Sequence, residues 1–232
     1  ASATSGTATM RFVGGATNNT ITNCTVLGSA AMAVGTNGGL IYFATDGVTA
    51  NGNDGNTVSN CNLGPAGVNL PSKAIYGNGS TGTAAIGNNN ITITNNNIAD
   101  VFGLAVQSAA IYLGGGNSAW TITNNRIYQT ASRTWTTGAI HRGIDIQNST
   151  STTGAQGFTI TGNIIGYASN TQTGTYTLIG GASGSKFQGI VFNGLTAGTS
   201  SAISNNTVAA VSFTGSTSNG TSTSAPFAGI II

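Results

Sequence analysis

Charged side chains are scarce in this sequence. They make up 4% of the 232 residues, against roughly 25% in an ordinary soluble domain. Glutamate is absent, so the four acidic residues are all aspartates. Six Lys or Arg residues leave a net charge of only +2, which provides neither a basic face for a phosphate backbone nor a polybasic run for anionic lipid. The composition therefore excludes nucleic acid and a membrane surface as main partners.

Long apolar stretches are missing as well. No run reaches the roughly 18 residues that a membrane-spanning segment requires, so we expect no membrane insertion. The first residues, Ala-Ser-Ala-Thr-Ser-Gly, lack the basic start and apolar stretch of a signal peptide. An export signal would have been removed or would lie upstream. Gly, Ser, Thr and Asn fill the polar positions, a composition typical of secreted bacterial surface proteins, and we expect an extracellular or cell-surface location.

One short motif recurs through the chain. Residues 120–127 have the sequence Trp-Thr-Ile-Thr-Asn-Asn-Arg-Ile, and five variants begin at Asn19, Asn56, Ile91, Phe158 and Ser201. The residue that follows Thr-Ile-Thr recurs at intervals of 37, 35, 29, 38 and 43 residues. Paired-helix repeats tolerate little variation in length. The uneven intervals therefore favour a solenoid in which short strands are constant and the turns between them vary.

A second apolar element follows each copy of the motif. It occupies residues 40–43, 74–76, 110–113, 143–146, 189–192 and 229–232, with residues 9–13 as an earlier member. A third, brief strand ends at Val26, Leu63, Ile98, Ile127, Ile165 or Val208. The sequence thus predicts an all-β solenoid of about six coils with three short strands each, forming a single domain over residues 1–232. The Gly-, Ser-, Thr- and Asn-rich segments 45–55, 77–90, 166–185 and 209–226 are predicted to be irregular turns.

Alternation along each strand predicts which side chains form the core. A period of two sends Ile122 inward and leaves Thr121 and Thr123 outward. Only two or three apolar residues per strand face the interior, so neighbouring coils about 4.8 Å apart must complete each other's hydrogen bonds and core. About six coils give a rod roughly 30 Å long.

The turn after Thr-Ile-Thr has a preference at each of its two positions. The first is Asn five times and Gly once, the residues that best tolerate a positive φ, so we expect a left-handed conformation there. The second position holds Asn96, Asn125, Asn163 and Asn206, preceded by Cys24 and Cys61. If these side chains point inward, the four amides form a hydrogen-bonded ladder that satisfies the polar groups of a tight bend.

The Asn-x-Ile-x-Asn-Asn motif followed by a Gly-Ile-x-Ile strand resembles the repeats of single-stranded, right-handed parallel β-helix proteins of the pectate-lyase-like superfamily. Among these, the chain is most similar to segments of large secreted or cell-surface bacterial proteins. The resemblance covers nearly the whole chain and implies the fold. It does not imply one function, because lyases, hydrolases, tailspikes and adhesins share this scaffold.

Three tyrosines occupy equivalent outward positions of the second strand, Tyr42, Tyr76 and Tyr112. They predict an exposed stripe of rings spaced by one coil. Such rings stack on the apolar faces of sugars, so a glycan or a partner protein is one interpretation. The alternative is lateral pairing that strengthens contacts between neighbouring strands.

His141, Arg142 and Asp145 lie together at the start of the fourth coil, with Lys186 one coil away. The resemblance implies that a lyase would hold Ca²⁺ with acidic residues beside an Arg or Lys base, and that a hydrolase would use paired carboxylates. The four aspartates instead fall in different coils and turns. We therefore expect no catalytic residues, and a surface ion pair between Arg142 and Asp145.

Two further features suggest a ligand or a crosslink. Asp46 and Asp54 bracket the one segment rich in oxygen ligands, a weak candidate for Ca²⁺ beside the interpretation as an ordinary turn, and no other cofactor is expected. Cys24 and Cys61 occupy the same turn position in adjacent coils. One strand spacing lies within the reach of a disulfide, but stacked side chains do not always meet its torsion, so a disulfide and two buried thiols are equal alternatives.

These observations favour a non-catalytic structural or adhesive module of a secreted bacterial surface protein, a rigid stalk that contacts glycans or cell-surface proteins. The first alternative is a lyase or glycoside hydrolase acting on polysaccharide. The second is a subunit of a filament, because the first and last strands lack an obvious polar cap and open coils would pair end to end. For the same reason the chain is expected to be an excerpt of a longer solenoid.

Overall fold

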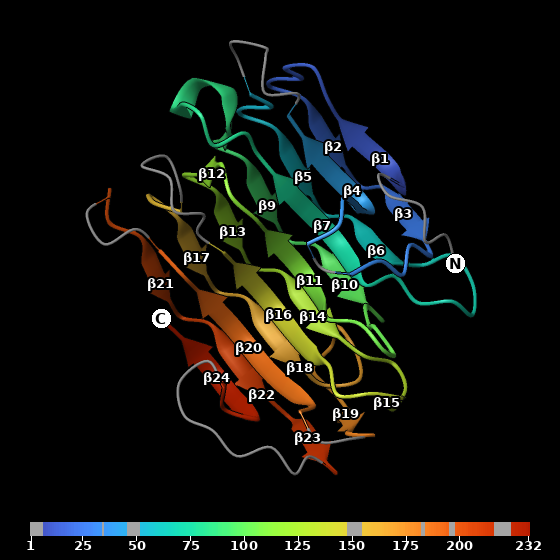
Figure 1. Cartoon of the computed structure of the whole chain (residues 1–232). Helices are drawn as coiled ribbons and strands as arrows, with labels where there is room; N and C mark the ends of the chain where they lie inside the picture. Colours follow the sequence, from blue (N-terminus) through green and yellow to red (C-terminus); the bar gives the residue numbers. More distant parts are fainter. Residues whose placement is uncertain are drawn as a thin grey trace.

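The computed structural model describes residues 7–33, 35–45, 52–147, 155–181, 184–194, 198–215 and 224–232. Figure 1 shows parallel strands stacked side by side along one axis, with the sequence colours changing steadily from one coil to the next. The predicted all-β solenoid is confirmed. Neighbours in each sheet are never consecutive strands, so the chain visits three sheets before it returns to the first.

Three long parallel sheets make up the coils. The Ile-Tyr sheet contains β1 (Thr7–Phe12), β4 (Gly38–Ala44), β7 (Lys73–Asn78), β11 (Ser108–Leu113), β16 (Ile140–Ile146), β20 (Lys186–Phe192) and β24 (Phe227–Ile231). The threonine sheet contains β2 (Thr20–Thr22), β5 (Thr57–Ser59), β9 (Thr92–Thr94), β13 (Thr121–Thr123), β17 (Thr159–Thr161) and β21 (Ala202–Ser204). The short-strand sheet contains β3 (Thr25–Gly28), β6 (Asn62–Pro65), β10 (Asn97–Ala99), β14 (Arg126–Tyr128), β18 (Ile164–Gly166) and β22 (Thr207–Ala209).

Two small sheets lie partly, and one short helix wholly, in the segments predicted to be irregular. A three-stranded sheet consists of β15 (Arg133–Thr134), β19 (Tyr176–Ile179) and β23 (Val211–Thr214), and a pair consists of β8 (Asn88–Asn89) and β12 (Asn117–Ser118). The 3-10 helix η1 spans Ala84–Ile86. The prediction of irregular turns is therefore wrong for β8, β19 and β23. Their flanking Gly, Ser and Thr residues obscured the alternating apolar side chains of β19 and β23, of which Tyr176 and Leu178 are buried.

The interior is a set of apolar columns, one residue per coil. Ile93, Ile122 and Ile160 are fully buried, while the threonines on either side of each are half-buried at the outer face. In the short-strand sheet, the prediction of an inward residue holds for Val26, Leu63, Ile98, Ile127 and Ile165, all buried. Each coil contributes too few apolar side chains to fold alone, and stacking completes the core.

The turn after the threonine sheet has the predicted backbone conformation in all six coils. Its first residue has a positive φ throughout, from 53° to 68°, at Asn23, Asn60, Asn95, Asn124, Gly162 and Asn205. The backbone N–H of each of the first five donates to the last residue of the neighbouring β-strand in the next coil, as Asn95 does to Thr123 at 3.0 Å. Asn and Gly are the residues that adopt this region at least cost, which explains their recurrence.

The second turn residue forms the predicted amide ladder. Asn125 Oδ1 accepts the backbone N–H and the side-chain amide of Asn96, both at 3.0 Å. Asn125 Nδ2 donates to Asn163 Oδ1 at 2.9 Å and to Ile93 O at 2.9 Å. Asn163 repeats this pattern toward Asn206. Asn96, Asn125 and Asn163 thus each link their own coil to both neighbouring coils inside an otherwise apolar tube, and Asn206 links the last turn to the coil before it.

Replacing the central amide tests how much the ladder stabilises the stack. Asn125→Leu has a similar branched shape but removes the acceptor of the Asn96 N–H and the donor to Ile93 O in a dry interior, so we expect a loss of about 3 kcal/mol in the free energy of unfolding. Chemical denaturation measures it. Asn124→Gly is the control, because Gly adopts the same positive φ and should change stability by less than about 1 kcal/mol. Equal effects would show that the ladder contributes little.

Candidate functional site

The three tyrosines stack as one column on the outer side of the Ile-Tyr sheet. Tyr42 pairs with Tyr76 and Tyr76 with Tyr112 in the strand register. Their ring centroids lie 5.1 Å and 5.4 Å apart and the rings are nearly parallel. The predicted exposure is wrong: Tyr42 and Tyr76 are only 3% and 2% exposed, and Tyr112 is half-buried. The geometry corresponds to the alternative, lateral pairing between neighbouring strands.

The segment between β3 and β4, of which residues 29–33 and 35–37 are described, covers the tyrosine column. We call this segment the strap. Lys73 extends along the column, donates to Ala33 O at 2.9 Å and to Thr36 O, and places its ammonium 4.5 Å from the Tyr76 ring centroid. The Tyr76 hydroxyl donates to Gly35 O at 3.4 Å. Burial lowers the pKa of Lys73 to about 8. The strap therefore rests on a cation that contacts backbone carbonyls and an aromatic face at once.

The predicted ion pair between Arg142 and Asp145 is present, but it is buried. Arg142 Nη1 donates to Asp145 Oδ2 at 2.7 Å, and the Asp145 side chain is not exposed at all. Gln107 and Gln147 also donate to this carboxylate, and Arg142 Nε donates to Gln188 at 2.8 Å. Burial raises the pKa of Asp145, while Arg142 and the amide donors act in the opposite direction. Both of its oxygens accept hydrogen bonds from side chains of this chain.

His141 is separated from Arg142 and Asp145. The imidazole is fully buried and lies in the interior among Phe102, Tyr176 and Phe187, whereas Arg142 lies on the outer side of the sheet. Alternation along β16 places adjacent residues on opposite faces. Lys186 does lie one coil away, paired with Ile140 in the register. The predicted cluster is thus an ion pair on one face and a histidine on the other.

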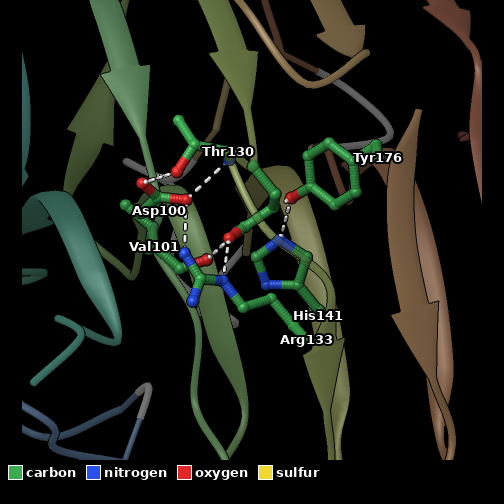
Figure 2. Close-up of polar contacts among 7 residues, drawn as sticks. Asp100, Val101, Thr130, Arg133, His141 and Tyr176 are labelled. Atoms are coloured by element: carbon green, nitrogen blue, oxygen red, sulfur yellow. Dashed lines mark hydrogen bonds and ion pairs between the residues drawn. The ribbon is translucent and has the colours of Figure 1, made fainter. Parts of the chain in front are cut away.

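A polar network connects His141 to the opposite wall of the tube (Figure 2). His141 Nε2 lies 2.5 Å from the Tyr176 hydroxyl, and Nδ1 lies 2.8 Å from Ser108 Oγ. Gln129 Nε2 donates to the same hydroxyl at 3.3 Å and to Val101 O at 2.6 Å. The tyrosine oxygen accepts from Gln129, so its own proton is available for Nε2. His141 is then the neutral tautomer that carries its proton on Nδ1 and donates it to Ser108.

The other end of the network is an ion pair near the surface. Arg133 donates through Nε to Gln129 Oε1 at 2.7 Å and through Nη2 to Asp100 Oδ1 at 2.5 Å. Asp100 also accepts from the backbone N–H and the hydroxyl of Thr130. Sequence analysis missed this network. Its members lie on β11, β15, β16 and β19 and in the turns after β10 and β14, and the small sheet that brings Arg133 beside Gln129 and Tyr176 near His141 was not predicted.

The electrostatics of the network oppose acid–base chemistry at neutral pH. Burial lowers the pKa of His141 to about 3 and raises that of Tyr176. The imidazole therefore stays neutral and the phenol stays protonated, with all their polar atoms bonded within the chain. A general base must reach a substrate proton. His141 and Ser108 are fully buried, so this arrangement fixes the position of a wall of the tube and offers no reactive group to solvent.

The structure describes one of the two aspartates of the calcium candidate. Asp46 lies outside the described residues. Asp54 accepts the backbone N–H of Asn89 in the next coil at 2.7 Å, and burial raises the pKa of its carboxyl. In the described part of the chain, no three His, Cys, Asp or Glu side chains come together as a metal site. Likewise, no described helix is long and apolar enough to cross a membrane.

Cys24 and Cys61 are both free thiols, so the disulfide alternative is not what the structure shows. Cys61 is buried and points its sulfur toward Ser59 O at 3.1 Å and Ile21 O at 3.8 Å. Its backbone N–H donates to Asn96 Oδ1 at 2.9 Å. Cys24 is exposed, because no coil lies beyond it among the described residues. Cys61 thus occupies a ladder position in which a thiol replaces the amide.

No family model, no curated protein and no solved structure matches the chain. The class of protein is therefore defined by its own geometry, a parallel β-helix solenoid with a buried asparagine ladder and two internal ion pairs among the described residues.

Extending the ladder by one amide should stabilise the protein. Cys61→Asn adds an amide that can donate to Asn96 Oδ1 and Ile21 O, so we expect a gain of about 1–2 kcal/mol in the free energy of unfolding, measured by denaturation in the presence of reductant. Cys24→Asn is the matched control. It lies at the open end of the stack next to a thiol and should gain almost nothing. A loss of stability in Cys61→Asn would mean that position 61 cannot hold a ladder amide.

His141 should make stability depend on pH. Its pKa is about 3 in the folded protein and about 6.5 in the unfolded chain. Below pH 6.5 the unfolded state binds the extra proton first. Stability is therefore complete above pH 6.5 and falls by about 1.4 kcal/mol per pH unit as pH decreases toward 3. Urea unfolding between pH 7.5 and 4, compared with His141→Gln, isolates the effect, since this is the single histidine of the chain. Parallel profiles for the two proteins would contradict it.

Proposed function

We propose that the chain is a non-catalytic structural or adhesive module of a secreted bacterial surface protein. It would act as a rigid stalk whose lateral faces contact glycans or other proteins. The observation that carries this proposal is the internal use of the groups suited to chemistry. His141 is sealed in the interior, Asp145 is bonded to Arg142 and two amides, and Asp100 is paired with Arg133.

Rigidity follows from the way the coils are joined. Each described coil is hydrogen-bonded to its neighbours through all three long sheets and through the turns between them. The amide ladder and the stacked tyrosines add side-chain contacts in the same direction. A rod held by such continuous contacts keeps two ends at a fixed separation, which is what a stalk requires.

Glycan contact has one supporting feature on the Ile-Tyr face. A hollow of about 420 Å³ is lined by Arg142, Gln147, Val191, Phe192, Asn193, Ile231 and Ile232. Arg142 Nη2 makes no hydrogen bond to another described residue. A guanidinium and two amides beside an apolar wall suit the mixed polar and apolar surface of a sugar. Of the residues predicted to bind a ligand, Arg142 lines this hollow and half-buried Tyr112 is next to its partner Asp145.

A second partner within this proposal is another β-helix coil. Within the described residues, β1 and β24 are the edges of the Ile-Tyr sheet and each is paired on one side only. Phe227 and Ile230 of β24 are 47% and 45% exposed. An open edge with apolar side chains pairs readily with further strands. Light scattering over a range of concentrations should show association, and a strictly monomeric species at high concentration would count against it.

The enzyme alternative predicts release of sugar from a polysaccharide. We expect no reducing or unsaturated ends after incubation with pectin, alginate and glucans, with and without Ca²⁺, since Asp100 and Asp145 are held in ion pairs with Arg133 and Arg142. Release that disappears in Asp145→Asn, while the variant stays folded, would establish a polysaccharide-acting enzyme and overturn the structural proposal.

A further inference from the structure

The outer face of the threonine sheet carries a regular two-column array of small side chains. The columns are Thr20, Thr57, Thr92, Thr121, Thr159 and Ala202, and Thr22, Ser59, Thr94, Thr123, Thr161 and Ser204. Nine of the twelve residues are threonines, two are serines and one is alanine. None is charged or aromatic. We call these twelve residues the threonine array.

The spacing of the array is set by the backbone. Every strand of the threonine sheet pairs with the next in the same register, without a slip over six coils. Neighbouring parallel strands lie about 4.8 Å apart, and alternate residues on a strand lie about 6.6 Å apart. The side chains therefore form a lattice of about 4.8 by 6.6 Å. Among the strands that the structure describes, no other outer face repeats one residue type in this way.

The side chains of the array are held in order. Fully buried Ile93, Ile122 and Ile160 fix the strands from below, and the left-handed turn with its amide ladder fixes their ends. Threonine is branched at Cβ, which restricts its first side-chain torsion. In the second column, Thr94 and Thr123 hydroxyls lie 2.8 Å apart, and those of Thr161 and Ser204 3.1 Å apart. The hydroxyls thus point along the column.

The first column keeps its hydroxyls available. The five threonines of this column make no side-chain hydrogen bond to another described residue, and all five are half-buried or exposed. Beside the second column, the exposed turn residues Asn23, Asn60, Asn95, Asn124 and Asn205 add a further polar row at the same spacing. The face combines fixed hydroxyls with fixed methyl groups on a repeat set by strand stacking.

We propose that the threonine array binds the surface of crystalline water. In a tetrahedral network with hydrogen bonds of about 2.75 Å, second-neighbour oxygens lie about 4.5 Å apart, close to the strand spacing of about 4.8 Å. Hydroxyls on such a repeat can take the places of lattice waters, and the methyl groups between them exclude disordered solvent. Without charged groups, the face has no strongly bound hydration shell of its own to remove.

The chemistry of the array favours ice over other surfaces. Protein partners are typically bound through aromatic side chains and arginine at the centre of an interface, and sugars through aromatic rings. The array has neither, and its tyrosine-bearing counterpart lies on another sheet. A crystal surface is periodic, so every coil of the array can make the same contact with it, and the contacts add up along the face. This proposal concerns a different face from the Arg142 hollow and stands or falls independently of the stalk proposal.

Ice capture tests the proposal directly. The full chain would be mixed with a reference protein, an ice hemisphere grown slowly from the solution, and the ratio of each protein in ice and in liquid measured. We expect the wild-type chain to be enriched in the ice and Thr121→Tyr to lose that enrichment, because the ring interrupts the lattice at its centre. Thr177→Tyr on β19 is the matched control, since it makes the same substitution at a half-buried position outside the array.

Folding and alternative ligands are controlled in the same experiment. Thermal unfolding of both variants identifies any loss due to instability, and Thr121→Lys with Thr177→Lys provides a second pair. Exclusion of the wild-type chain from ice would overturn the proposal. So would equal capture of wild type and the folded Thr121 variants, or binding to insoluble cellulose or chitin without capture by ice. None of these results depends on whether the chain releases sugar.

Discussion

No coil of this protein can satisfy its own backbone. The strands of the three long sheets are three to seven residues long, and their hydrogen bonds pass to the coil before and the coil after. The bends between strands pose the hardest case, because a sharp turn leaves polar groups facing a dry interior. Asn or Gly at positive φ makes the turn, and the following amide bonds both neighbouring coils. The repeat in the sequence exists because this condition recurs in every coil.

This condition explains why most of the fold could be predicted. The turn residues Asn23 to Asn205, the ladder of Asn96, Asn125, Asn163 and Asn206, and the inward isoleucines each have a local cause that is visible in one coil. The small sheet of β15, β19 and β23 has no such signal. Its strands lie in Gly- and Thr-rich turns of unequal length, and only their pairing with each other and the ring contact between Trp135 and Phe213 distinguish them from loops.

The candidate site was predicted less well, because its geometry depends on what covers each face. Periodicity placed Tyr42, Tyr76 and Tyr112 in one outward row, and the strand register confirms that row. Periodicity contains no information on the strap that Lys73 holds over the tyrosines, so their burial could not be foreseen. The sequence also suggested a cluster of His141 and Arg142, because the two residues are neighbours in the chain. Adjacent residues of a strand lie on opposite faces, and the histidine's true partners come from β19 and from Ser108.

The stacking of the coils also limits which groups of the protein can contact a ligand. Polar groups inside the tube must be bonded to one another, since an unpaired buried group costs about 1–3 kcal/mol. The ladder amides are bonded to one another, and Asp100 and Asp145 are held in ion pairs with Arg133 and Arg142. Groups that bind a ligand must therefore lie on the outer faces. Where the sequence places the same side chain in every coil, the stacking of the coils sets the distance between these side chains on the surface. A strap covers the tyrosine column, whereas the threonine face keeps its hydroxyls at the surface in register over six coils. A face that is regular because the core requires it is suited to a ligand that is itself regular.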